Sequence, residues 1–472
     1  MTLTMATTIV VISDAGTLAP ETKDDIGAYS DIVGSRSDVN APIVADTITN
    51  QSYELKPGSL LWIPKGSRAS FTKSEGLSTI YVEQRPGEGN FRTGSEAKAP
   101  CHLRIQETLA GENARSVFRG DPFVLCMEGG QGPYLYSVDK REYLDFVSDY
   151  SAAFYGHSNP AIAEAINSAL STGFCSGSAT RRECHLGECI KRRFPSMERV
   201  SFCNSGTEAN TYALATAMEF TGRNKVGGNK SNVSYDFILG TYNNIEANQK
   251  HVSSDLAAII VEPMLSTGGQ ILATREFLSF PRKIADVTGA VLIFNEIMTS
   301  CLQINGLQGL HKIGPGMTTL GKYIGGGLPF GAFGGRSDIM AFHEQRTQKL
   351  SHHGTFNNDV FTMSAALNAT DLVTEDEIRR VNKLGDTIRN RMLETCATHH
   401  FYDLEITGQG SAIELQFLHL NRNLLMGLLF YHMLEHGIWI GRSGFLLLNM
   451  CHTEDHVQRF LTAFQEFIKE FK

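Results

Sequence analysis

The strongest constraint on the fold is an alternation of apolar strand-like runs with amphipathic helical patterns in the middle of the chain. Ala290–Phe294 is a continuous apolar run, which is typical of a strand buried on both faces of a sheet. Arg199–Cys203 and Leu256–Val261 have the composition of further strands, and residues 207–221 carry small and apolar residues at helical spacing. This alternation predicts an α/β domain with a mostly parallel sheet.

Composition narrows the class of protein. The 472 residues are 42% hydrophobic and 19% charged, with a net charge of −8, which predicts a soluble globular chain of about two to four domains. No basic block indicates binding to nucleic acid or to a membrane surface, and we expect no signal peptide and no membrane span. The nine cysteines are scattered without a CxxC pair or a histidine cluster, so we predict reduced thiols, no metal site and a cytoplasmic protein.

Residues 1–86 form a separate, β-rich segment. Short β-favouring runs are separated by turns such as Pro57-Gly58 and Pro64-Lys65-Gly66. The run Lys56–Ser67 resembles the late strands of a small cupin barrel, although residues 1–100 contain no histidine to hold a cupin metal. We therefore expect a partial, metal-free, cupin-like segment with a structural or docking role, a sugar- or metal-binding role being the alternative. A glycine-rich linker is expected over residues 87–104.

Two polar motifs follow predicted strands, where open α/β sheets bind ligands, and a third surrounds a lysine. Ser205, Gly206 and Thr207 open a predicted helix, a pattern that suits either an anion site or an ordinary N-cap. Asn295 ends the strand Ala290–Phe294. Lys322 lies between small and hydroxyl residues and just before three glycines. Its amine could condense with an aldehyde there, although a surface lysine on a glycine loop has the same local pattern.

In this order the motifs resemble the class III, fold type I, pyridoxal-phosphate aminotransferases, and in detail the glutamate-1-semialdehyde aminomutase-like branch. The resemblance covers roughly residues 105–470. It implies a large cofactor-binding domain over residues 105–360, with residues 105–150 contributing its first strands, and a small α/β domain over residues 361–472. The runs that carry it are Tyr143–Phe146, Tyr155–Pro160, Asn204–Asn210, Val261–Met264, Thr318–Gly335 and Gly354–Asn358.

The resemblance also implies roles for single residues. Lys322 is expected to form the internal aldimine with pyridoxal 5'-phosphate and then to shuttle the α-proton of the substrate. Ser205, Gly206 and Thr207 are expected to hold the cofactor phosphate. Thr355 is expected to reach the phosphate bound by a neighbouring subunit, which implies a homodimer with shared active sites.

Two residues are implied in substrate binding. Arg115 lies where relatives hold the substrate carboxylate, and a surface salt bridge is its alternative role. Glu208 is expected to support the site, although an acid in the first turn of any helix would fit equally well. Arg442 could also reach a substrate carboxylate, but a structural ion pair explains it better.

The chain departs from the family pattern in two places. Relatives carry an aspartate where this chain has Asn295, and that carboxylate keeps the pyridine nitrogen of the cofactor protonated. After Lys225 the sequence passes directly to Gly227-Gly228, so the aromatic turn that stacks on the cofactor in relatives is missing, together with a strand's length of sequence. Either the chain has diverged or its reading frame is incomplete.

The C-terminal part is predicted to mix helices and strands. Apolar residues at helical spacing predict a helix over residues 378–392, and alternation predicts strands over residues 402–417. A second helix is predicted over residues 423–435, followed by strands paired with one another over residues 438–449. Thr453 is predicted to cap a last helix.

The resemblance predicts an aminotransferase or aminomutase that acts on a small amino acid or amino-carbonyl compound. Its partners would be a small-molecule amino donor and a carbonyl acceptor. Two alternatives stay open because of Asn295 and the missing aromatic turn: a catalytically impaired pseudoenzyme or scaffold, and a racemase-type activity on the same cofactor.

Overall fold

The computed structural model describes residues 125–174, 177–228, 236–344 and 350–471, positions 109 and 115, and seven short strands within residues 2–84. The chain forms two compact units. The first comprises Met1–Glu128, Tyr136–Arg141 and His419–Leu428, and the second comprises Gly129–Leu135, Glu142–Leu418 and Leu429–Lys472. Each is described by itself.

The N-terminal strands of the first unit pair antiparallel. β1 (Thr2–Thr4) pairs with β6 (Arg68–Ser70), β3 (Ile43–Asp46) pairs with β4 (Gln51–Glu54), and β2 (Thr8–Ile12) lies between β5 (Leu60–Ile63) and β7 (Ile80–Gln84). These strands agree with a β-rich segment, and its likeness to a cupin stays a prediction. The predicted linker over residues 87–104 lies outside the described residues.

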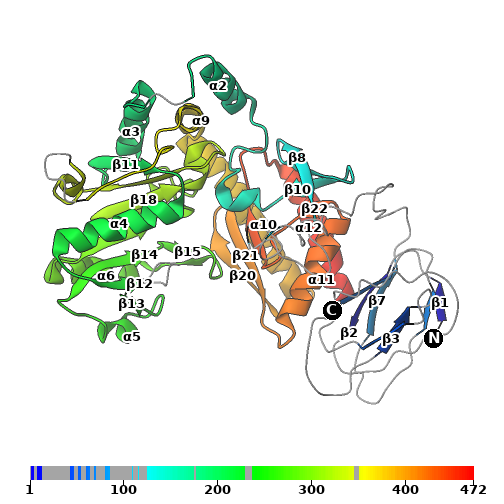
Figure 1. Ribbon diagram of the computed structural model, residues 1–472. Helices are drawn as coiled ribbons and strands as arrows, with labels where there is room; N and C mark the ends of the chain where they lie inside the picture. Colours follow the sequence, from blue (N-terminus) through cyan, green and yellow to red (C-terminus); the bar gives the residue numbers. More distant parts are fainter. Residues whose placement is uncertain are drawn as a thin grey trace. The chain divides into compact units, whose positions relative to one another are not determined.

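A mixed seven-stranded sheet forms the centre of the second unit (Figure 1). Neighbouring strands are parallel except where β19 takes part, because β19 is antiparallel to both β11 and β18. The predicted α/β fold with a mostly parallel sheet is therefore confirmed. The strand order is β11 (Arg199–Cys203), β19 (Gly331–Gly335), β18 (Met317–Gly321), β17 (Val291–Asn295), β14 (Leu256–Val261), β12 (Lys225–Gly228) and β13 (Asp236–Leu239).

The position of β12 corrects one expectation. A strand was expected to be lost after Lys225, yet Lys225–Gly228 forms β12, which pairs parallel with both β13 and β14. The backbone N–H and C=O groups of β14 need hydrogen-bond partners on the side away from β17. A segment that contains glycine can supply them, because the pairing uses backbone groups only. The residues that follow this strand, 229–235, lie outside the described residues.

Helices cover both faces of this sheet, as the alternation of side chains along β17 shows. Val291 and Ile293 belong to the apolar cluster that contains α4 (Gly206–Thr221). Leu292 and Phe294 belong to the cluster that contains α6 (Arg275–Thr288). Because successive side chains of a strand point to opposite faces, α4 and α6 lie on opposite sides of the sheet.

Further elements precede the C-terminal part of the chain. The helices are α2 (Pro160–Leu170), α3 (Arg181–Arg193), α5 (Ile245–Gln249), α7 (Gly306–His311), α8 (Ser337–Met340) and α9 (Val360–Leu372), with 3₁₀ turns at Ser148–Ser151, Thr299–Cys301, Lys322–Gly325 and Ala341–His343. Additional strands are β8 (Met127–Gln131), β9 (Tyr134–Ser137), β10 (Glu142–Asp145), β15 (Met264–Leu265) and β16 (Ile271–Leu272). Two of them, β8 and β9, are divided between the two units.

The predicted C-terminal elements form with one correction. α10 (Glu375–Thr398), α11 (Arg422–Glu435) and α12 (Glu454–Glu470) are the expected helices, and β20 (Leu404–Gln409) pairs with β21 (Ala412–Phe417). The two strands after α11 do not pair with one another, so that prediction was wrong. β22 (Ile438–Trp439) pairs with β10, and β23 (Phe445–Leu447) pairs with β21, because each strand completes a different sheet.

Glu296 holds the chain reversal that follows β17. Its fully buried carboxylate accepts hydrogen bonds from the Thr299 hydroxyl at 2.5 Å and from the backbone N–H groups of Leu307 at 3.1 Å and Gln308 at 2.7 Å. Burial raises the pKa of Glu296, and these donors act in the opposite direction by stabilising the anion. The carboxylate thereby fixes the turn that separates β17 from β18.

Within the described part of the chain, no helix has the length and apolar character needed to cross a membrane.

Two glycines inside helices predict opposite effects of adding a methyl group. A Cβ at Gly187 in α3 meets nothing within 4 Å, whereas a Cβ at Gly385 in α10 overlaps the backbone carbonyl of Gly410. Gly187→Ala should raise the free energy of unfolding by about 0.5–1 kcal/mol, because alanine is the better helix former. Gly385→Ala should lower it despite the same gain, and urea unfolding measures both. Equal shifts of one sign in the two variants would contradict the tight contact at Gly385.

Replacing Glu296 should test its role in the turn. Glu296→Gln keeps the size of the side chain but replaces one carboxylate oxygen by an N–H₂ group. Both oxygens of Glu296 accept hydrogen bonds, so this N–H₂ group would face a donor instead of an acceptor. We expect a loss of about 1–3 kcal/mol in the free energy of unfolding, since a buried donor remains unsatisfied. Urea unfolding of the variant beside the exposed substitution Glu405→Gln measures this loss. A Glu296→Gln variant as stable as the control would show that the carboxylate does not hold the turn.

Candidate active site

Three strand ends meet at one edge of the central sheet. β17 and β18 are parallel, with Asn295 opposite Thr319, and β11 runs in the same direction because both are antiparallel to β19. Their carboxyl ends therefore lie at the same edge, where α/β sheets bind ligands. A Cβ added to Gly321 would lie 3.4 Å from the Cα of Gly206, so the segments after β11 and β18 are in close contact.

The segment after β11 forms a helix N-terminus with free donor capacity. Ser205 is the N-cap of α4, and its hydroxyl accepts a hydrogen bond from the Glu208 N–H at 3.2 Å. Gly206 and Thr207 follow as the first residues of the helix, and Thr207 is exposed. The first N–H groups of an α-helix have no partner within the helix, and its dipole favours an anion there. This end of α4 can therefore bind a phosphate or a carboxylate.

Glu208 holds this segment in shape. One carboxylate oxygen accepts from the Asn204 backbone N–H at 3.0 Å, and the other faces the Ser205 hydroxyl at 3.4 Å. The contact resembles a capping box, in which an acid in the first turn returns to the chain before the helix. The described contacts of Glu208 are thus within the loop, and its predicted contact with substrate stays a prediction.

Lys322 directly follows β18 in an unusual backbone conformation. Its φ is +54°, a left-handed value that is uncommon for residues other than glycine and is often found at functional sites. The residue is half-buried. Burial raises the pKa of the nearby Cys301 thiol to about 12, and the positive charges of Lys322 and Arg193 lower it in part. The amine of Lys322 therefore lies in a protected environment that also contains a thiol and a second cation.

Arg193 fixes the residue next to the lysine. It donates to the Tyr323 hydroxyl at 2.7 Å and to the backbone carbonyls of Ser300 at 2.8 Å and Ile304 at 2.6 Å. Tyr323 is fully buried, and its burial raises its pKa to about 12. Sequence reasoning missed Arg193, because it ends a run of three basic residues that has the appearance of a solvated helix end. It is a positioning residue for the lysine loop.

Asn295 presents donors to the site. Its side-chain oxygen Oδ1 accepts a hydrogen bond from the Ile297 backbone N–H at 3.2 Å. A backbone N–H can only donate, so the oxygen of the amide must face it. The N–H₂ group of Asn295 is then the part of the side chain that remains for a ligand. An aspartate at this position would offer an acceptor and a negative charge instead.

The segment Gly354–Asn358 lies against the anion-binding loop. The Asn357 side-chain oxygen accepts a hydrogen bond from the Asn204 amide at 2.9 Å. Thr355, two residues earlier, is exposed. Its exposure leaves its hydroxyl accessible from outside the chain. A contact with a second subunit stays a prediction.

The two candidate substrate arginines have different surroundings. Arg115 is exposed and belongs to the first compact unit, so its predicted role in substrate binding stays untested. Arg442 lies over the rings of Phe430 at 5.2 Å and Tyr431 at 5.6 Å, and it donates to the Tyr431 hydroxyl at 3.2 Å. These contacts favour the structural role over the substrate-binding role for Arg442.

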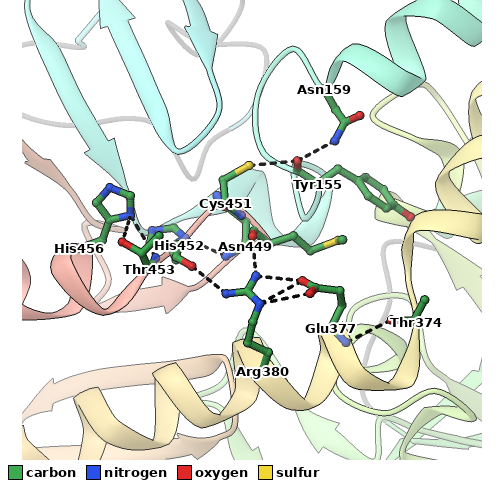
Figure 2. Close-up of polar contacts among 11 residues, drawn as sticks. Tyr155, Asn159, Thr374, Glu377, Arg380, Asn449, Cys451, His452, Thr453 and His456 are labelled. Carbon is green, nitrogen blue, oxygen red and sulfur yellow. Dashed lines mark hydrogen bonds and ion pairs between the residues drawn. The ribbon is translucent and has the colours of Figure 1, made fainter.

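A polar network joins Arg380 of α10, the loop 449–453 and Tyr155 (Figure 2). Arg380 of α10 donates to two backbone carbonyls of the loop 449–453 at 2.6 and 2.9 Å. From the same loop, the Cys451 thiol donates to the Tyr155 backbone carbonyl at 3.4 Å. The Tyr155 ring lies 6.2 Å from the Tyr323 ring, measured between centroids. These contacts therefore extend from Arg380, through the loop 449–453 and Tyr155, to the ring of Tyr323, which is the residue after the lysine.

Comparison with known proteins agrees with this arrangement. The model of the class III aminotransferase family matches residues 117–236 and 230–468. An uncharacterized aminotransferase of Schizosaccharomyces pombe is 37% identical over 425 residues, which cover 83% of this chain and 96% of the relative. A glutamate-1-semialdehyde 2,1-aminomutase of Methanothrix thermoacetophila is 28% identical, with 78% of this chain and 95% of the relative covered.

A solved structure supports the same assignment. The beta-phenylalanine aminotransferase of Variovorax paradoxus superimposes with a TM-score of 0.76 at 35% identity, covering 78% of this chain and 93% of that protein. The family model spans most of the chain, and the fold is the one that the sequence motifs predicted. The chain belongs to the class III aminotransferases, which are enzymes that use pyridoxal 5'-phosphate.

Proposed function

We propose that this protein transfers the amino group of a small amino acid or amino-carbonyl compound to a carbonyl acceptor, with Lys322 as its catalytic amine. The observation that carries the proposal is the meeting of Ser205–Thr207, Asn295 and Lys322 at one edge of the sheet. Both transaminases and aminomutases are among its relatives, and the transaminase of Variovorax paradoxus is the more similar, at 36% against 28% identity. We therefore favour transfer between two molecules over transfer within one.

The residues at this edge fit the family's cofactor. The N-terminus of α4 at Ser205, Gly206 and Thr207 would hold the phosphate. The Lys322 amine would bind the aldehyde carbon, and the N–H₂ group of Asn295 would face the ring nitrogen. When bound, pyridoxal phosphate accepts the amino group of the donor and passes it to the acceptor. After the donor replaces it, the Lys322 amine would take the α-proton of the substrate and return it.

Thr355 is proposed to complete the phosphate site of a second copy of the chain. It is exposed, and its loop is held next to the anion-binding loop by the contact between Asn357 and Asn204. The active enzyme would then be a homodimer whose two sites share residues. Arg115 and Glu208 remain candidates for substrate binding, and Glu208 is the better candidate for positioning the phosphate loop.

Asn295 should set the rate of proton removal. An amide donor stabilises an unprotonated ring nitrogen, whereas a carboxylate stabilises a protonated one. A neutral ring withdraws electrons from the α-carbon of the substrate less strongly, so proton removal is slower. This single observation favours the impaired pseudoenzyme as the second candidate function, because the rate loss could reach several powers of ten at about 1.4 kcal/mol for each.

Restoring the charge is the direct test of this point. In Asn295→Asp, a single turnover with an amino donor should be at least about tenfold faster than in the wild type. The rate is measured as the loss of the visible absorbance of the cofactor. The ¹⁵N chemical shift of the labelled ring nitrogen should move to the protonated range, independently of turnover. The exposed substitution Asn243→Asp is the matched control. Equal rates and shifts in wild type and Asn295→Asp would contradict the proposed role.

Titration with amino donors, beginning with β-amino acids, distinguishes the candidate functions. A transaminase converts the bound cofactor to its aminated form and releases a carbonyl product. A racemase returns the cofactor unchanged with a donor of inverted configuration. A scaffold shows no cofactor spectrum before or after addition, and this result would overturn the proposed function.

A further inference from the structure

Four residues with metal-binding side chains lie at the end of α11 and on α12, two helices labelled in Figure 1. His432 and His436 are one helical turn apart at the end of α11, and Glu466 and Glu470 are one turn apart on α12. One nitrogen of each histidine and one carboxylate oxygen of Glu466 all lie within 4.8 Å of one another. All four residues belong to the second compact unit.

Backbone carbonyls fix which nitrogen of each histidine carries hydrogen. His432 Nε2 lies 2.9 Å from the Ala463 carbonyl, and His436 Nδ1 lies 2.8 Å from the His432 carbonyl. A carbonyl only accepts, so both of these nitrogens are donors. In a neutral imidazole the other nitrogen then carries a lone pair. These lone pairs are on His432 Nδ1 and His436 Nε2.

Both lone-pair nitrogens face carboxylates. His436 Nε2 is 2.8 Å from Glu466 Oε2, and His432 Nδ1 is 4.0 Å from Glu470 Oε2. A lone pair and a carboxylate repel each other at such distances unless a positive charge lies between them. A metal-bound histidine commonly donates its second N–H to a backbone carbonyl, and both histidines already do so. We propose that His432, His436, Glu466 and Glu470 bind a divalent metal ion of the zinc type.

The distances suit a tetrahedral ion. With bonds of about 2.0–2.1 Å, the ligand atoms of a tetrahedral zinc site are about 3.3 Å apart. The pairs at 2.8 and 4.0 Å lie on either side of this value. The ligand atoms of His432, His436 and Glu466 are already grouped within 4.8 Å, and Glu470 would have to move toward them to complete the four. Two imidazoles with two carboxylates favour zinc or a neighbouring transition metal over magnesium, which prefers an all-oxygen shell.

The site is supported on one side and accessible on the other. The His432 side chain is only 5% exposed, whereas Glu466 and Glu470 are about half exposed. An ion can thus enter from the surface and meet a fixed first ligand. Bound there, it would join α11 to α12 and stabilise the C-terminal helix. The i, i+4 histidine pair is the signal in the sequence, and an analysis based on cysteine spacing overlooked it.

Zinc titration of the full-length holoenzyme tests the site. The protein is treated with a chelator, exchanged into metal-free buffer, and titrated with zinc chloride in a calorimeter, with magnesium chloride in a parallel titration. We expect one zinc per chain, no binding of magnesium at this site, and an upward shift in Tm with zinc. His436→Gln and Glu466→Gln should each weaken zinc binding at least about tenfold.

The controls separate this site from other zinc ligands in the chain. His400→Gln, an exposed histidine on a different segment, should bind zinc as tightly as the wild type. An unchanged cofactor spectrum shows that each variant is folded, and Glu466→Gln replaces His436→Gln if the latter is not. Zinc affinity that is the same in all variants would assign the metal to other residues of the chain and overturn the proposal. Absence of zinc binding would show that the histidines are protonated partners of the two glutamates.

Discussion

The site depends on the shared direction of β11, β17 and β18. Because these strands run the same way, whatever follows their last residues must meet at one edge of the sheet. Residues 205, 295 and 322 are distant in the sequence, yet the register of the sheet leaves them adjacent. The loops meet closely at Gly206 and Gly321, and a Cβ added to Gly206 would overlap the Ile297 side chain. The position of the candidate site is therefore set by the pairing of these strands more than by any single loop.

Buried or half-buried polar residues then hold the loops that leave this edge. Glu296 closes the turn after β17, Arg193 holds the residue beside the lysine, and Glu208 shapes the start of α4. The described hydrogen bonds of each charged group are with backbone groups or neighbouring side chains. Such groups are costly to bury unless their hydrogen bonds are made, so they also specify one arrangement of the loops. The left-handed lysine is stable only within such a framework.

Much of this arrangement could be predicted from the sequence, because its signals are local. The apolar run ending at Phe294 indicates a strand followed by a functional residue, and the small-residue loop around Lys322 indicates a tight turn that holds an amine. The partners of strands are not local, and for this reason β22 and β23 were wrongly paired with one another. The role of Arg193 was equally hidden, since its hydrogen-bond partners are more than one hundred residues away in the sequence.

The most direct test of the central claim is to find where the cofactor attaches. The purified protein is incubated with pyridoxal phosphate, reduced with borohydride, digested and analysed by mass spectrometry. The account predicts that the pyridoxyl group is found on Lys322, and that Lys322→Ala shows no modification at a comparable level. Labelling spread over several surface lysines, and equal in the wild type and the variant, would contradict an active site at this edge of the sheet.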